Sequence, residues 1–72
     1  MAEVRAEIAA NVWQVPVSDG QEVSEGEELA ILESMKMEIP VEAPASGTVT
    51  DLRVAPDDQV QEGDLLLVID EG

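Results

Sequence analysis

The sequence repeats one pattern of apolar residues and turns after 37 positions. The segment 23–27 (VSEGE) falls on 60–64 (VQEGD), and the apolar segment 29–32 (LAIL) falls on 66–69 (LLVI). One half is too short to bury an apolar face alone. We therefore expect two similar halves to pack around a shared core, related by a pseudo-two-fold axis.

The length and the repeat together predict a single domain over residues 1–72, with repeat halves of about 4–35 and 41–72. Short runs rich in β-branched residues alternate with Gly, Pro and Asp turns, and no segment has a sustained helical period. This pattern predicts an all-β barrel or sandwich in which each half contributes four strands.

The expected strands and core follow from the same pattern. Residues 9–11 (AAN) read as a break between the first two strands, and Gly26 and Gly63 read as turn positions that other residues avoid. The strands are predicted over 4–8, 12–17, 21–23, 29–33, 37–41, 48–54, 59–60 and 65–70. The core is predicted from Val12, Val17, Val23, Leu29 and Ile31, with their counterparts Val49, Val54, Val60, Leu66 and Val68.

Lys36 is the only lysine in a chain that carries 17 acidic residues. It lies between Met35 and Met37 in the link between two predicted strands, and hairpin tips expose their central residues. Its counterpart in the repeat would be position 73, just after Gly72. The two-fold therefore predicts Lys36 at one end of the domain and the chain termini at the other.

The chemistry of a lone lysine favours attachment over catalysis. A free lysine amine has a pKa of about 10.4 and is protonated near neutral pH. The chain has no histidine, cysteine or tyrosine to remove that proton, and Glu33 or Glu38 would stabilise the charged form. We therefore predict no catalytic residue here, and a Lys36 side chain that another enzyme modifies.

Two segments resemble the biotinyl (biotin/lipoyl attachment) domain family: 33–39 (ESMKMEI), which contains the Met-Lys-Met attachment signature, and 43–49 (APASGTV). With the glycine turns and the internal two-fold, the resemblance covers about Val4 to Asp70. It implies a flattened β-barrel or sandwich of two four-stranded antiparallel sheets. The chain resembles the short free-standing biotinylated proteins, or the carrier domain of a biotin-dependent carboxylase.

The resemblance also implies a function. Biotin would be joined by an amide to Lys36 by a biotin protein ligase. Met35 and Met37 would be flanking recognition residues, and Ser34 and Glu33 further recognition residues. Biotin would carry activated CO2 from a biotin carboxylase to a carboxyltransferase that acts on an acyl-CoA or a 2-oxo acid. The domain would be a non-catalytic swinging arm, and a monomer when isolated.

The chain departs from the family pattern in two places. Ser34 stands where alanine is usual before Met-Lys-Met, although the residue is still small. The protruding thumb insertion of some bacterial carriers is absent, because the segment 17–21 (VSDGQ) is too short for it.

Three other functions share some of these features. A lipoyl carrier of a 2-oxo acid dehydrogenase or of the glycine cleavage system would have the same fold and hairpin lysine. Such domains usually have Asp before the lysine and a small residue after it, unlike Met35 and Met37. An acyl carrier protein would use Ser34 at a helix start, which the strand pattern disfavours. An unmodified acidic interaction module would leave the Met-flanked lysine unexplained.

Charge and composition limit the possible partners. The net charge of −14 disfavours nucleic acid and anionic membrane surfaces. No cysteine is present for a disulfide or a thiolate metal site, and the acidic turns lack the spacing of a calcium loop, so no metal site is predicted. No apolar run approaches the ~20 residues of a membrane span. We expect a cytoplasmic protein.

Overall fold

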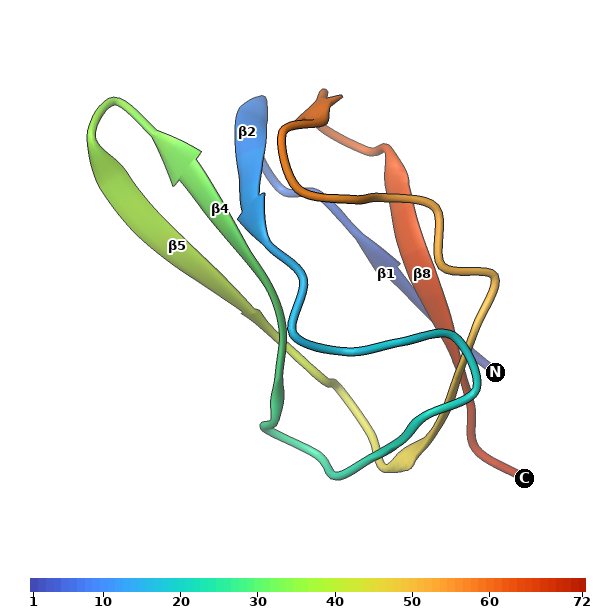
Figure 1. The fold of residues 1–72 in the computed structure, drawn as a ribbon. Coiled ribbons are helices and arrows are strands. Elements are labelled where there is room, and N and C mark those ends of the chain that lie inside the picture. Colours follow the sequence, from blue (N-terminus) through green and yellow to red (C-terminus); the bar gives the residue numbers. More distant parts are fainter.

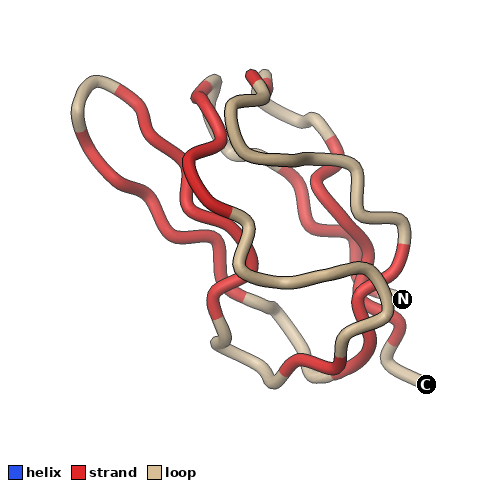
Figure 2. Tube along the Cα trace, in the orientation of Figure 1, coloured by secondary structure: helices blue, strands red, loops and turns tan.

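The computed structural model describes residues 1–72 and contains eight β-strands and no helix (Figures 1 and 2). None of its elements is a helix with the length and apolarity needed to cross a bilayer. The strands are β1 (Ala2–Arg5), β2 (Ala10–Gln14), β3 (Glu22–Val23), β4 (Glu28–Ser34), β5 (Met37–Glu42), β6 (Gly47–Thr50), β7 (Gln59–Val60) and β8 (Leu65–Asp70).

Two four-stranded sheets form the domain, with strand orders β1-β8-β6-β3 and β5-β4-β2-β7. Every strand pair is antiparallel. A shift of 37 residues turns each strand of the first sheet into its partner in the second, in the same order. The predicted all-β fold with two related four-stranded sheets is therefore confirmed.

Backbone hydrogen bonds outside the strands obey the same two-fold. The amide of Val12 donates to the carbonyl of Asp58 at 2.7 Å. The matching amide of Val49 donates to the carbonyl of Gln21 at 2.8 Å. The repeat therefore fixes the loop connections as well as the strands.

The glycine turns also correspond. Gly26 has a φ of 87° and Gly63 has a φ of 89°, the left-handed region that residues with a Cβ avoid. The amide of Gly26 donates to the carbonyl of Ala43 at 2.9 Å, and that of Gly63 donates to the carbonyl of Ala6 at 2.8 Å. Each glycine turn is thus hydrogen-bonded to the segment that follows an edge strand of the other half.

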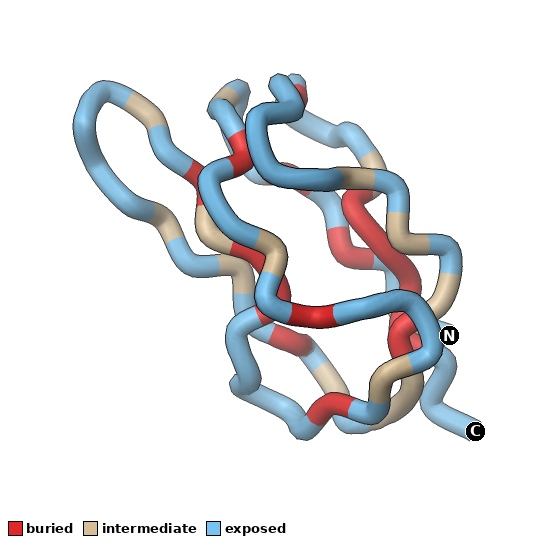
Figure 3. The backbone as a smooth tube through the Cα atoms, viewed as in Figure 1, coloured by how far each residue is buried: buried red, intermediate tan, exposed pale blue.

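The core lies between the two sheets (Figure 3). Eight of the ten predicted core residues are buried, and Ile31 and Val54 are only half-buried. In β4 a register irregularity between Glu28 and Ala30 buries both Leu29 and Ala30 and resets the alternation, so that Leu32 points inward. The packed cluster is Val4, Ala6, Val12, Val17, Val23, Leu29, Leu32, Ala43, Val49, Val60, Leu66, Leu67 and Ile69.

Several strand boundaries differ from the sequence prediction. The first strand ends at Arg5, because the next residue, Ala6, exchanges backbone hydrogen bonds with the turn around Gly63 and Asp64. The break between the first two strands covers residues 6–9, earlier than the predicted 9–11, since Ala10 already pairs with Val60 in the sheet.

The second and sixth strands are shorter than predicted. β2 ends at Gln14, two residues before Pro16, which lacks the amide hydrogen needed to continue a ladder. β6 ends at Thr50, because Asp51 has a positive φ of 51° that breaks the extended backbone. Local backbone geometry therefore sets both ends.

The hairpin of β4 and β5 extends from one end of the molecule, and both termini lie at the opposite end (Figure 1). The amino group of Met1 forms an ion pair with Glu71 at 3.4 Å, beside the pairing of β1 with β8. The molecule measures 36 × 18 × 17 Å along its principal axes. The predicted separation of Lys36 from the termini is thus present in the fold.

Candidate functional site

The turn at the hairpin tip consists of two residues, Met35 and Lys36. The strands on either side pair in continuous register from Ala30 opposite Val41 to Ser34 opposite Met37. Met35 has a φ of 52° and Lys36 a φ of 65°. Positive φ at both central residues is the signature of a type I′ turn, whose twist matches that of the strands.

This turn conformation is unusual for these residue types. Type I′ turns strongly favour Asn and Gly, which tolerate positive φ, whereas Met and Lys pay a steric penalty. The hydrogen-bonded register of β4 and β5 holds the two residues in place. The tip therefore has a defined backbone conformation, although its sequence is a poor turn sequence.

Side chains at the tip are open to solvent. Met35 is 92% exposed and Met37 is 65% exposed, and Lys36 is also exposed. Neither methionine fills a gap in the core, because both side chains extend into solvent. Ser34 is half-buried and Glu33 is exposed. The structure therefore brings the five predicted site residues together at one end of the hairpin.

Lys36 is the one cationic side chain without an ion pair. Arg5 pairs with Glu3 at 3.0 Å, and Arg53 pairs with Asp51 at 2.9 Å. The N-terminal amine makes the remaining ion pair, with Glu71. The side chain of Lys36 also takes part in no hydrogen bond of the structure.

The two acidic neighbours of the turn face each other. Glu33 and Glu38 are directly opposite across the hairpin and both are exposed. Neither forms an ion pair with Lys36. The amine thus extends from an acidic stem without an ion-pair partner in the protein.

A hollow of about 300 Å³ beside the turn brings in residues that the sequence did not single out. Ser34 and Met35 line one side, and Asn11, Gln59 and Gln61 line the other. These polar residues come from distant segments joined by the pairing of β2 with β7, which places Asn11 opposite Gln59. Only the alignment of the two repeat halves could have indicated this neighbourhood.

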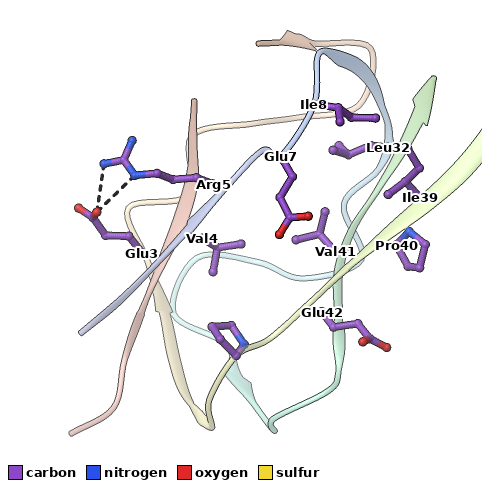
Figure 4. A pocket seen from close by; sticks show the side chains of 11 residues that line it. Glu3, Val4, Arg5, Glu7, Ile8, Leu32, Ile39, Pro40, Val41 and Glu42 are labelled. Carbon is purple, nitrogen blue, oxygen red and sulfur yellow. Dashed lines mark hydrogen bonds and ion pairs between the residues drawn. The ribbon is translucent and has the colours of Figure 1, made fainter. Parts of the chain in front are cut away.

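A second, larger groove of about 390 Å³ lies away from the turn, between the edge strands β1 and β5 (Figure 4). Val4 and Val41, which correspond in the repeat, both line it, and the Glu7 side chain extends toward Val41. Arg5 is held by Glu3 and by the Gly63 carbonyl at 2.8 Å. No group of acidic residues in the structure is arranged to hold a metal ion.

Comparisons with known proteins agree with this geometry. The biotin/lipoyl family model, described as "Biotin-requiring enzyme", matches residues 1–69. The biotinylated protein TB7.3 homolog of Mycobacterium leprae is 53% identical over 70 residues, which are 96% of this chain and 99% of that protein. The biotin/lipoyl attachment protein of Bacillus subtilis is 48% identical over 64 residues, covering 89% of this chain and 88% of that one.

A solved structure of a much larger protein also contains this fold. A single-chain, multi-domain long-chain acyl-CoA carboxylase matches with a TM-score of 0.90 and 33% sequence identity. The match covers 97% of this chain and 7% of the carboxylase chain. The likeness therefore concerns one small part of that enzyme.

Proposed function

The chain belongs to the biotin/lipoyl attachment family, and from that premise we propose that it is a biotin carboxyl carrier with biotin amide-linked to Nζ of Lys36. The observation that carries the proposal is the tip itself. Lys36 is exposed, has no ion pair, and stands in a two-residue turn between Met35 and Met37. A relative that is 53% identical over almost its whole length is named as biotinylated.

The residues present fit this prosthetic group. Acylation of Lys36 would break no ion pair or hydrogen bond and would bury no core surface. Biotin, when bound, supplies a site that holds activated CO2. The chain's own residues hold the attachment nitrogen at a defined point of the hairpin and keep it clear of the barrel. Lys36 thus acts as an anchor and takes no part in proton transfer.

Recognition by partner enzymes is assigned to the surface around the anchor. Met35 and Met37 present exposed thioethers, and Ser34 and Glu33 continue the surface down the hairpin. We assign this surface to a biotin protein ligase, a biotin carboxylase and a carboxyltransferase that acts on an acyl-CoA or a 2-oxo acid. The chain itself performs no chemistry and works as a cytoplasmic, monomeric carrier domain over residues 1–72.

The elongated shape supports this role. The anchor lies at the far end of a 36 Å long molecule from the paired termini. A partner's active site can therefore receive the tip without meeting the end of the domain where the chain begins and ends. A lipoyl carrier would use the same hairpin amine, and the exposed Met35 and Met37 favour biotin.

Carboxylation of the loaded domain tests the carrier role. The biotinylated protein, incubated with an isolated biotin carboxylase, ATP and bicarbonate, should stimulate ATP cleavage, and the unmodified protein should not. Lys36→Arg, treated with the ligase in parallel, is the matched control. Equal ATP cleavage with biotinylated and unmodified protein would contradict the proposal.

A further inference from the structure

Every sulfur atom of this protein lies at the surface. The chain has three methionines and no cysteine, and Met1, Met35 and Met37 are 78%, 92% and 65% exposed. The packed core contains only Val, Ala, Leu and Ile. An oxidant that reacts with sulfur therefore finds its targets without any unfolding, and two of the three targets flank Lys36.

We propose that Met35 and Met37 form a reversible oxidation site, and that methionine sulfoxide at this site blocks the modification of Lys36. The oxidant class is a peroxide. The second half of the proposal rests on the proposed function, because it concerns recognition of Lys36 by a biotin protein ligase. The first half, oxidation at the tip, stands on the exposure of the two thioethers alone.

The chemical step needs only the thioether and hydrogen peroxide. The sulfur lone pair attacks one peroxide oxygen and the O–O bond breaks. The departing hydroxide takes the proton of the transferred hydroxyl, so the products are the sulfoxide and one water molecule. Sulfur loses two electrons and the peroxide gains them. Reduction by a sulfoxide reductase consumes two thiols, which become a disulfide, and returns the thioether and water.

The position of the two sulfur atoms explains why their oxidation would affect the modification of Lys36. Met35 is a central residue of the turn, and Met37 is paired with Ser34 at the first step of the hairpin. Any enzyme that reaches the amine of Lys36 must cover one or both neighbouring thioethers. A sulfoxide replaces a soft apolar group by a polar one, and covering it without a hydrogen-bond partner is unfavourable.

The same geometry predicts that oxidation leaves the fold intact. Neither thioether belongs to the buried cluster, and the hairpin register depends on backbone hydrogen bonds. The oxidised protein should keep its melting temperature while it loses competence as a ligase substrate. This combination distinguishes specific inhibition by oxidation at Met35 and Met37 from general oxidative damage.

The experiment treats the unmodified protein with hydrogen peroxide, removes the peroxide with catalase, and then adds biotin, ATP and biotin protein ligase. Peptide mapping should find sulfoxide at Met35 and Met37 while the circular dichroism spectrum is unchanged. The kcat/KM for biotinylation should fall by roughly tenfold, and a sulfoxide reductase with a dithiol should restore it. Unchanged kcat/KM in a fully oxidised sample would overturn the proposal.

The double variant Met35→Leu/Met37→Leu is the matched control, because leucine keeps an apolar side chain of similar volume without sulfur. Its own kcat/KM should be the same before and after peroxide, although Met1 is still oxidised. An equal loss of kcat/KM in this variant would place the inhibitory oxidation elsewhere in the chain and contradict the proposal. If the untreated wild-type protein accepts no biotin, the proposed function fails, while the peptide map still decides whether the tip is the oxidation site.

Discussion

Glu33 and Glu38 stand directly opposite each other across the β4–β5 hairpin, in the second residue pair from the turn that presents Lys36. Like charges in this arrangement are destabilising, and neither carboxylate is compensated by an ion pair. The stem of the hairpin therefore carries a local cost in stability. Its acidic surface stays available to partners that approach the tip.

Replacing Glu38 by Gln should stabilise the domain, because the change removes the repulsion and keeps the side-chain shape. We expect a gain of about 0.2–1 kcal/mol in the free energy of unfolding at low salt. Salt should raise the stability of the wild type more than that of the variant, since it screens the exposed pair. Urea titrations at two salt concentrations measure both effects. Glu25→Gln, in an exposed turn, is the control, and an equal gain there would assign the effect to net charge.

The turn offers a second prediction. Met35→Asn/Lys36→Gly should raise the free energy of unfolding by about 1–2 kcal/mol, because these residues accept the positive φ values of 52° and 65°. The same double variant should accept no biotin. Thermal and urea unfolding check the stability, and intact mass checks the modification. A less stable variant would mean that the Met35 and Lys36 side chains contribute packing that outweighs the backbone strain.

Substitutions in the two glycine turns should lower the stability of the domain. Gly26→Val and Gly63→Val should each destabilise the domain by about 1–2 kcal/mol, because valine is forced into a φ near 90°. No neighbouring atom would clash with the added Cβ at either position, so the penalty is conformational. Melting temperatures of the two variants should fall by similar amounts. No change in either would contradict the assigned turn conformation.

Gly20 supplies the matched control for these turns. It has a φ of 89°, and its counterpart in the repeat, Asp57, has a φ of 76° without being glycine. Gly20→Asp should therefore cost less than Gly26→Val. The comparison separates a position that tolerates a short polar residue from one that holds a β-branched side chain in a forbidden region.

Lys36→Ala should leave the fold intact. The side chain is exposed and unpaired, and surface substitutions of this kind stay within about 0.5 kcal/mol of the wild type. Leu32→Ala, on the same strand pair but fully buried, should cost about 2–5 kcal/mol. Urea unfolding of both variants measures the contrast. A large loss in Lys36→Ala would show that the tip supports the core.

Much of the fold could be read from the repeat. The match of Val12 with Val49, and of the two glycine turns, fixed the number of strands, the two-fold and the position of Lys36 opposite the termini. The partial exposure of Ile31 could not be predicted, because the irregularity in β4 that turns Leu32 inward depends on pairing with β5. Strand ends at Arg5 and Thr50 also depend on tertiary contacts and local φ values that composition does not encode.

The candidate site could also be predicted only in part from the sequence. The Met-Lys-Met segment and its place in a hairpin could be predicted, because both are local in sequence. The positive φ of both turn residues could not, since Met and Lys are atypical there. The hollow beside the tip escaped prediction too, because Asn11 and Gln59 meet Met35 only through the sheet.

The mass of the modified protein shows whether Lys36 is a biotin anchor. The protein is co-expressed with a biotin protein ligase and, separately, with a lipoate ligase, and each product is analysed by intact mass and peptide mapping. We predict a single biotinyl increment, on the peptide containing Lys36, in the first sample alone, and none in Lys36→Arg. A lipoyl increment instead, or a folded protein that accepts neither group, would contradict it.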